Sequence, residues 1–221
     1  MFWKTELKAN EWVMETLRTG YVIPFESLPP VYEEPNNASA AQDPTFVNNA
    51  INDLYRLGII AFSDVKPHCV SPLTVSLKTG RDGLTKKRLC WDGSRCVNKY
   101  LRKQKVTLSH LQRALEITKE EDFQITYDLK AAYHHIKIDS AHTKYLGASI
   151  KKPGGGIQYF VFLFLPFGLA SAVHCITKLF KPLNAYIHEN GVRHTIYLDD
   201  GRIVAKTAAE AENQRSLCML F

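Results

Sequence analysis

The sequence has few cysteines, and none of them is spaced for metal binding. The five cysteines are odd in number and contain no Cys-x-x-Cys pair, so neither a zinc site nor a disulfide framework is favoured. This usage is typical of reducing compartments. We therefore expect an intracellular protein, cytoplasmic or nuclear, and not a secreted one.

Long apolar runs are also missing. Lys4, Glu6 and Lys8 interrupt any apolar start, which argues against a signal peptide. The most apolar stretch, residues 159–173, is too short to cross a bilayer and is broken by a proline and a glycine. It is typical of a buried strand, a turn and the start of a helix, so no membrane partner is expected.

The sequence contains no internal repeat and no low-complexity tract. Its 221 residues are 45% apolar and 23% charged, which fits one domain or two closely joined subdomains. The formal net charge of +6 favours polyanionic partners, although a basic balance alone is weak evidence for them.

Apolar residues at helical spacing predict several helices. Their expected ranges are 6–20, 43–58, 107–118, 169–191 and a last helix from about residue 207. Asp43 suits the N-cap of the second helix and Pro44 its first position. Pro182 is expected to kink or split the fourth helix. Residues 27–44, rich in Pro, Asn and Ser, are expected to be an extended surface segment.

Alternating apolar and polar residues predict strands. They are expected at 70–78 and 86–92, at 122–129, and in hairpins at 145–165 and 195–204. Helices and strands do not alternate regularly as they do around a parallel sheet. The sheet is therefore expected to be largely antiparallel, in an α+β fold.

Two neighbouring acids, Asp199 and Asp200, stand inside the last hairpin. Turn formation explains Asp200 with Gly201, because Asp-Gly tolerates the positive φ of tight turns, but it explains Asp199 less well. Asp128 ends another predicted strand, and adjacent strands would bring the carboxylates together, where they repel unless cations lie between them. Mg²⁺ held by carboxylates and substrate phosphates fits, and two such ions serve phosphoryl transfer. Spacing alone leaves strand-end capping and turn formation as the alternative.

Four motifs in order give the chain a resemblance to reverse transcriptases. The palm motifs of that family resemble FQITYDLKAAYHHIKI (123–138), FLPFGLASAV (164–173) and YLDDGRIV (197–204). Its fingers motif resembles KKRLCWDGSRCVNKYL (86–101). The segments GYVIPFESLPP, NNASA and VSPLTVSLK are similar to the lead-in of DIRS-type retrotransposon polymerases, which carry a tyrosine recombinase elsewhere.

The resemblance implies the fingers and palm of a right-hand polymerase, with an antiparallel palm sheet backed by helices and the thumb absent. Residues 1–44 would form an N-terminal helix and extended lead-in to the fingers, 45–122 the fingers, and 123–221 a palm truncated before the primer grip and thumb.

The resemblance also implies a set of catalytic residues. Asp128 and Asp199 match the metal-binding acids, Asp200 matches the second acid of the Tyr-Leu-Asp-Asp turn, and the Leu129 backbone carbonyl would complete the coordination of a metal. The implied cofactor is a pair of Mg²⁺ ions, with Mn²⁺ as an alternative. The implied reaction is attack of a primer 3′-hydroxyl on the α-phosphate of a deoxynucleoside triphosphate.

A second implied group binds the nucleotide. Arg88 and one lysine, Lys78 or Lys86, match the residues that grip the triphosphate. Tyr133 matches the bulky residue that excludes a ribonucleotide 2′-hydroxyl; the alternative is a core aromatic. Phe167 and Gly168 match the loop beside the nascent pair, where the alternative is an ordinary strand-to-helix turn. Arg81 and Lys87 lie in the predicted hairpin that joins the strands at 70–78 and 86–92. For these two charges, a solvated hairpin tip is an equally good interpretation.

Template and primer contacts are expected from four residues, which are Arg95, Asn98, Tyr197 and Leu198. Arg202 follows the acid pair and would compete for the carboxylates unless strand alternation points it away. The expected partners are an RNA or DNA template with its primer and deoxynucleoside triphosphates.

The sequence thus predicts an RNA-directed DNA polymerase of a retroelement, part of a polyprotein that supplies a thumb, RNase H and a tyrosine recombinase. The rival hypothesis is a truncated, catalytically inactive remnant that at most binds nucleic acid. Both metal acids are intact, which favours the enzyme. The missing thumb favours the remnant, because much nucleic-acid affinity comes from phosphate contacts spread over the duplex.

Overall fold

The computed structural model describes residues 2–80, 83–108, 111–152 and 154–218. The chain forms two compact units that interleave in sequence. Unit 1 comprises residues 1–15, 105–132 and 173–221, and unit 2 comprises residues 16–104 and 133–172. Each unit has its own sheet and is described separately.

The helices are short apart from three. The α-helices are α1 (Phe2–Thr5), α2 (Glu11–Thr19), α3 (Ala38–Ala41), α4 (Pro44–Arg56), α5 (Leu111–Glu116), α6 (Ala172–Glu189) and α7 (Ala208–Cys218). The 3₁₀ turns are η1 (Val97–Tyr100), η2 (Ala132–His135) and η3 (Thr143–Tyr145).

The strands pair in three sheets. They are β1 (Tyr32–Glu33), β2 (Ile60–Ser63), β3 (Cys69–Val70), β4 (Leu73–Thr79), β5 (Thr85–Trp91), β6 (Phe123–Asp128), β7 (Gly147–Lys151), β8 (Ile157–Phe162), β9 (Arg193–Tyr197) and β10 (Asp200–Ala205). The described residues therefore form a mixed α+β fold, as the sequence predicts.

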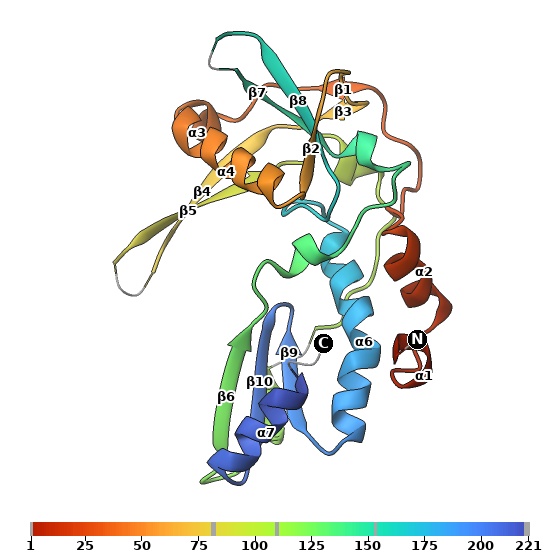
Figure 1. The fold of residues 1–221 in the computed structure, drawn as a ribbon, viewed down its shortest axis with the longest axis vertical. Helices are drawn as coiled ribbons and strands as arrows, with labels where there is room; N and C mark the ends of the chain where they lie inside the picture. Colours follow the sequence, from red (N-terminus) through yellow and green to blue (C-terminus); the bar gives the residue numbers. More distant parts are fainter. Residues whose placement is uncertain (1, 81–82, 109–110, 153, 219–221) are drawn as a thin grey trace. The chain divides into compact units, whose positions relative to one another are not determined.

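Unit 1 is built on an antiparallel three-stranded sheet in the order β6-β10-β9. Helix α7 packs on β6 and β10 (Figure 1). The α6 residue Ile187 and the β10 residue Ile203 form the buried core together with Val192. This packing explains the apolar alternation of β10, since its inward residues face the helices.

Helix α6 runs unbroken through Pro182, so the predicted split is not found. A proline inside a helix removes one backbone hydrogen bond and crowds the preceding turn. Here Ile176 and Leu179 before the proline and Ile187 after it are all buried. Burial on both sides of the proline holds the helix together.

Unit 2 contains a five-stranded mixed sheet in the order β1-β3-β7-β8-β2. The pairs β1–β3 and β3–β7 are parallel, and the other two are antiparallel. Trp91, at the end of β5, is one of the largest buried side chains. Its indole N–H donates to the Gly147 carbonyl at 2.9 Å, which ties the hairpin to the sheet.

Strands β4 and β5 form a separate two-stranded hairpin, which projects in Figure 1. Next to it, α4 begins as predicted. Asp43 caps it by accepting from the Phe46 N–H at 3.2 Å, and Pro44 occupies the first turn. The cap side chain also pairs with Lys87 of β5.

Some predictions about local structure were wrong. Residues 27–44 are not wholly an extended surface segment, because they contain helix α3 and because β1 is paired into the unit 2 sheet. Backbone pairing of Tyr32 with Cys69 and packing of α3 on β4 supply contacts that are distant in sequence. The helix predicted at 107–118 is shorter, from Leu111 to Glu116; residues 109 and 110 lie outside the described part.

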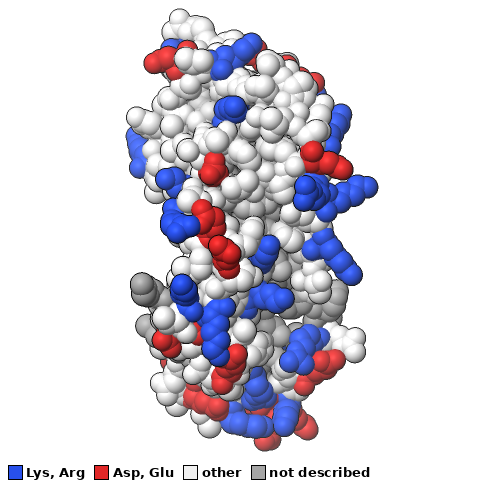
Figure 2. Space-filling view, turned by 90° about the vertical axis from the view of Figure 1, so that its right-hand side faces the viewer, with Lys and Arg blue, Asp and Glu red and all other residues white. Residues whose placement is uncertain are grey.

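The surface carries charges of both signs. Over the face in Figure 2, Lys and Arg side chains are spread among acidic ones. None of the described helices is long and apolar enough to cross a membrane. The division into fingers and palm at residues 44/45 and 122/123 remains a prediction.

Candidate active site

The β9–β10 turn presents the paired acids. Its two connecting residues are Leu198 and Asp199, since Tyr197 pairs with Asp200 across the hairpin. Leu198 has φ +59°, an uncommon conformation for a residue with a side chain. The prediction that Asp200 and Gly201 form the turn is therefore wrong, because both lie in β10. Glycine is needed at position 201 because the Tyr127 ring lies against it.

The three acids of the motif gather at one end of the unit 1 sheet. Asp128 of β6 lies directly opposite Asp200 of β10. The backbone N–H of Leu129 donates to the Asp199 carbonyl at 2.9 Å, which ties the end of β6 to the turn. Because opposed residues share one face of a sheet, Asp128 and Asp200 point to the same side.

A cavity of about 780 Å³ opens on this face. It is lined by Asp128, Asp200, Tyr197 and other residues of the three strands, and by Ala114 of α5. Tyr197 is half exposed there. Leu198 does not line this cavity; it borders a separate groove beside α6. Of the two predicted primer contacts in this unit, only Tyr197 shares the cavity with Asp128 and Asp200; Asp199, in the turn, is not among its lining residues.

The acids fit a hard metal ion by their chemistry. Among the described residues, no hydrogen bond or ion pair compensates the carboxylates of Asp128, Asp199 or Asp200. The described residues also hold no ready-made group of three or more His, Cys, Asp or Glu that could bind a metal. Mg²⁺ is commonly held by one or two carboxylates plus substrate phosphates, not by a protein cage. The donor set therefore suits a metal that arrives with its substrate.

The Leu129 carbonyl already accepts a bond from the Ala132 N–H at 3.2 Å. A carbonyl oxygen has two lone pairs, so this bond leaves one for a metal.

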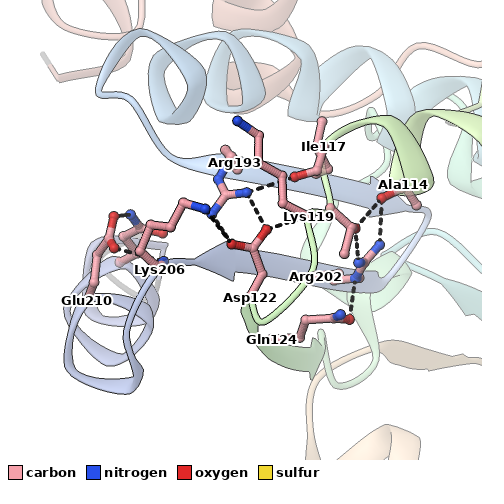
Figure 3. Close-up of polar contacts among 11 residues, drawn as sticks. Ala114, Ile117, Lys119, Asp122, Gln124, Arg193, Arg202, Lys206 and Glu210 are labelled. Atoms are coloured by element: carbon pink, nitrogen blue, oxygen red, sulfur yellow. Dashed lines mark hydrogen bonds and ion pairs between the residues drawn. The ribbon is translucent and has the colours of Figure 1, made fainter.

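Strand alternation does not point Arg202 away from the acids, because Arg202 lies two residues after Asp200, on the same face, and lines the same cavity. Its guanidinium donates to the Gln124 side chain at 3.0 Å, to the Ala114 carbonyl at 2.9 Å and to the Thr118 hydroxyl (Figure 3). These contacts join α5 to the sheet. Arg202 therefore does not neutralise the paired acids.

A second polar cluster anchors the opposite end of the sheet. Arg193 donates both guanidinium nitrogens to Asp122, at 2.6 and 3.0 Å, and Lys206 lies 3.4 Å from the same carboxylate (Figure 3). The Asp122 side chain is inaccessible to solvent. The hydrogen bonds from Arg193 hold the pKa of Asp122 far below its usual range. No local sequence pattern predicts this cluster.

Three residues missed by sequence reasoning lie on the opposite face of the sheet from the acids. The Tyr127 ring lies against Gly201, where an added Cβ would come within 2.0 Å of the ring. The Tyr127 hydroxyl is 2.5 Å from Nε2 of His194, and the two rings are stacked at 6°. Burial lowers the pKa of His194 to about 4, so the imidazole is neutral at pH 7.

Unit 2 carries the predicted nucleotide-binding residues. Lys78 lies directly opposite Lys86 on the β4–β5 hairpin, and Arg88 lies two positions along β5. All three are exposed and share one face by alternation. Lys87 faces the other way and pairs with Asp43, so it is not part of this group. Arg81 lies outside the described residues.

The Arg88 guanidinium stands 5.3 Å from the centre of the Phe167 ring. Tyr133 packs edge-on against the same ring at 5.0 Å and is buried. Arg88 and Phe167 also line a pocket of about 310 Å³ beside α4. The structure therefore brings three of the predicted nucleotide-binding residues together.

Gly168 makes the turn that follows Phe167. It has φ +116°, and an added Cβ would lie 1.7 Å from the Trp91 carbonyl oxygen. No other residue type fits so close to another backbone. The Trp91 N–H donates to the Phe167 carbonyl at 3.0 Å, so this turn is joined to the end of β5.

Asn98 and Arg95 make contacts within unit 2. The Asn98 amide donates to the Gly168 carbonyl at 2.8 Å and accepts from the Ala170 N–H at 2.9 Å. Arg95 pairs with Glu34 at 2.9 Å. Their predicted roles toward the template remain predictions.

Comparison with known proteins places these residues in a family. Residues 76–220 match the model of the reverse transcriptase (RNA-dependent DNA polymerase) family. No curated protein matches the chain. The family match spans both the basic hairpin and the paired acids and covers more than half of the sequence. The chain therefore belongs to the reverse transcriptase family, whose members are RNA-directed DNA polymerases and nucleotidyltransferases.

Proposed function

We propose that this chain catalyses template-directed DNA synthesis with Asp128 and Asp199 as its metal-binding acids and Asp200 as an accessory acid. The observation that carries this proposal is the meeting of two strand ends. Asp128 stands opposite Asp200, and Asp199 is tied to the residue after Asp128. Uncompensated carboxylates at one edge repel each other, and such an arrangement persists where cations complete it.

Two Mg²⁺ ions, or Mn²⁺, would supply charge neutralisation and activation of the attacking hydroxyl when bound. The protein supplies the oxygen ligands, from the carboxylates and the Leu129 carbonyl. Tyr197, the last residue of β9, and Leu198, the first residue of the turn, are proposed to contact the primer.

In unit 2, Lys78, Lys86 and Arg88 are proposed to grip the triphosphate. Like charges directly opposite one another destabilise a hairpin, and an anion bound on that face offsets this repulsion. Arg supplies a planar, bidentate donor set, and Lys a mobile point charge. Tyr133, held edge-on by Phe167, is proposed to exclude the 2′-hydroxyl of a ribonucleotide.

The proposed template contacts in unit 2 are Arg95 and Asn98. The amino-terminal segments quoted above support an origin in a DIRS-type retrotransposon, in which a longer polyprotein contributes a thumb, RNase H and recombinase. The proposed setting is intracellular, in cytoplasm or nucleus, with primed RNA or DNA as partner.

A single-turnover primer-extension assay tests the proposal. The chain is mixed with an RNA template, a DNA primer, Mg²⁺ and one deoxynucleotide, beside Asp128→Asn and Asp199→Asn. Asp64→Asn, which alters an exposed acid in unit 2, is the matched control. We expect incorporation by the parent and the control, and a loss of at least about 10²-fold in the two variants. No incorporation by a folded parent chain would favour the inactive remnant.

A further inference from the structure

We propose that Tyr127 and His194 are positioning residues for the metal-binding acids, acting through the strand ends that carry those acids. This inference rests on the proposed function. It starts from the residues behind the acids, which neither the motifs nor the family match explain.

The register of the sheet couples the acids to the residues on its opposite face. Tyr127 immediately precedes Asp128, and its partner Gly201 immediately follows Asp200. Side chains alternate between the faces of a strand. The Asp128–Asp200 pair and the Tyr127–Gly201 pair are therefore consecutive along the two strands, with side chains on opposite faces of the sheet. A displacement of one pair moves the other.

The Tyr127 ring approaches the backbone of β10 closely. Gly201 is buried, and the Tyr127 ring occupies the space that a side chain there would fill. The ring therefore lies across β10, and its hydroxyl reaches His194 on β9 at 2.5 Å. One partly buried contact thus joins all three strands of the sheet, on the face opposite the acids.

The contact between Tyr127 and His194 is polar. His194 is only 1% exposed, and among the described residues its Nδ1 has no hydrogen-bond partner. Whichever ring nitrogen carries the proton, one buried nitrogen stays unmatched. Leaving such an atom unpaired is unfavourable, and an apolar pair of the same shape would avoid it. A directional hydrogen bond, unlike an apolar contact, fixes the distance between β6 and β9.

The physical consequence concerns the spacing of the acids. Asp128 is on β6, whereas Asp199 is in the turn after β9. The Tyr127–His194 bond spans the strands from which these two acids extend. Residues that orient metal ligands from behind commonly change metal affinity by 10–100-fold when they are removed.

The test compares Tyr127→Phe, His194→Phe and the double variant with the parent chain. Each substitution keeps an aromatic ring in place and removes the hydrogen bond. Tyr55→Phe is the matched control, because Tyr55 is exposed and lies in unit 2. Mn²⁺ affinity is measured by titration calorimetry of the folded chain, without nucleotide. Single-turnover incorporation is then followed across Mg²⁺ and deoxynucleotide concentrations.

We expect each single variant to weaken Mn²⁺ binding about tenfold and to raise the Mg²⁺ requirement of incorporation similarly. The half-saturating deoxynucleotide concentration should change less than twofold at saturating Mg²⁺. The double variant should bind Mn²⁺ no more weakly than either single variant, since the same hydrogen bond is lost in all three.

Two results would overturn the inference in different ways. Unchanged metal affinity with only a lower melting temperature would make the pair purely structural and leave the proposed function standing. If the parent chain itself bound no Mn²⁺ and incorporated nothing, the proposed function would fail, and the inference with it.

Discussion

The packing of Tyr127 on β10 requires a glycine at position 201. Glycine normally weakens a strand relative to alanine by about 0.5–1 kcal/mol. At position 201 the stability that alanine would normally add is outweighed, because its Cβ would lie 2.0 Å from the Tyr127 ring. The ring is tethered by His194 and has little freedom to move aside.

Gly201→Ala should therefore destabilise the chain by roughly 1–3 kcal/mol, the usual range for overpacking, and impair incorporation. Urea unfolding at neutral pH measures the first effect. Gly154→Ala is the control, because an added Cβ at Gly154 meets nothing within 4 Å. Equal stability of both variants would refute the close packing of Tyr127 on β10.

His194 makes folding stability depend on pH. Burial, reinforced by nearby His188, lowers its pKa to about 4, whereas an unfolded histidine titrates near 6.5. Between these values only the unfolded state takes up the proton. Stability is therefore fully present above about pH 6.5 and is lost as the pH falls toward 4, by roughly 3 kcal/mol in total.

Urea unfolding between pH 7.5 and 4 tests this dependence. The parent chain should lose stability over that interval, and His194→Phe should show a clearly shallower slope. Parallel slopes for the two proteins would mean that other groups carry the pH dependence.

At the scale of elements, one side chain holds the turn between β8 and α6. Asn98 both donates to Gly168 and accepts from Ala170. Asn98→Ala removes both bonds and should raise the half-saturating deoxynucleotide concentration, because Phe167 loses its support. Asn98→Asp keeps the acceptor for the Ala170 N–H but turns a carboxylate oxygen toward the Gly168 carbonyl oxygen, so it should be impaired at least as much as the alanine variant. Steady-state incorporation measures the series, and a half-saturating deoxynucleotide concentration equal to that of the parent in either variant would contradict this role.

The base of the unit 1 sheet depends on Asp122. Its carboxylate is closed off from solvent and paired with Arg193 and Lys206. Asp122→Asn should lower the urea midpoint at pH 7, because two cations lose their partner. Glu120→Gln, an exposed acid two residues earlier, is the control.

The stabilising effect of Asp122 should also depend on pH. The pKa of Asp122 is lowered by its hydrogen bonds from Arg193, so its stabilisation is present above the unfolded pKa, near 3.9, and is lost as the pH falls below it. The difference in urea midpoint between parent and Asp122→Asn should therefore shrink between pH 5 and 2. A constant difference would show that the charge of Asp122 is not responsible.

Across the whole molecule, the sequence predicted best what local chemistry determines. Asp43 and Pro44 begin α4 as expected, and Asp128 ends β6. What it missed depends on distant partners. Gly201 was interpreted as a turn residue because an Asp-Gly pair is typical of turns. The pair itself does not show that a neighbouring ring requires the glycine. Pro182 did not split α6, since the helix is buried on both sides of it. The Tyr127–His194 contact joins strands that no local pattern connects.

We propose that the acids at the ends of β6 and β9 catalyse DNA synthesis on a template. One measurement tests it most directly: extension of a primer on an RNA template by each of the four deoxynucleotides separately, with Mg²⁺, for the parent chain and Asp199→Asn. The account predicts that the parent adds only the complementary deoxynucleotide and that the variant adds none. Addition of all four regardless of template, or equal addition by Asp199→Asn, would contradict it.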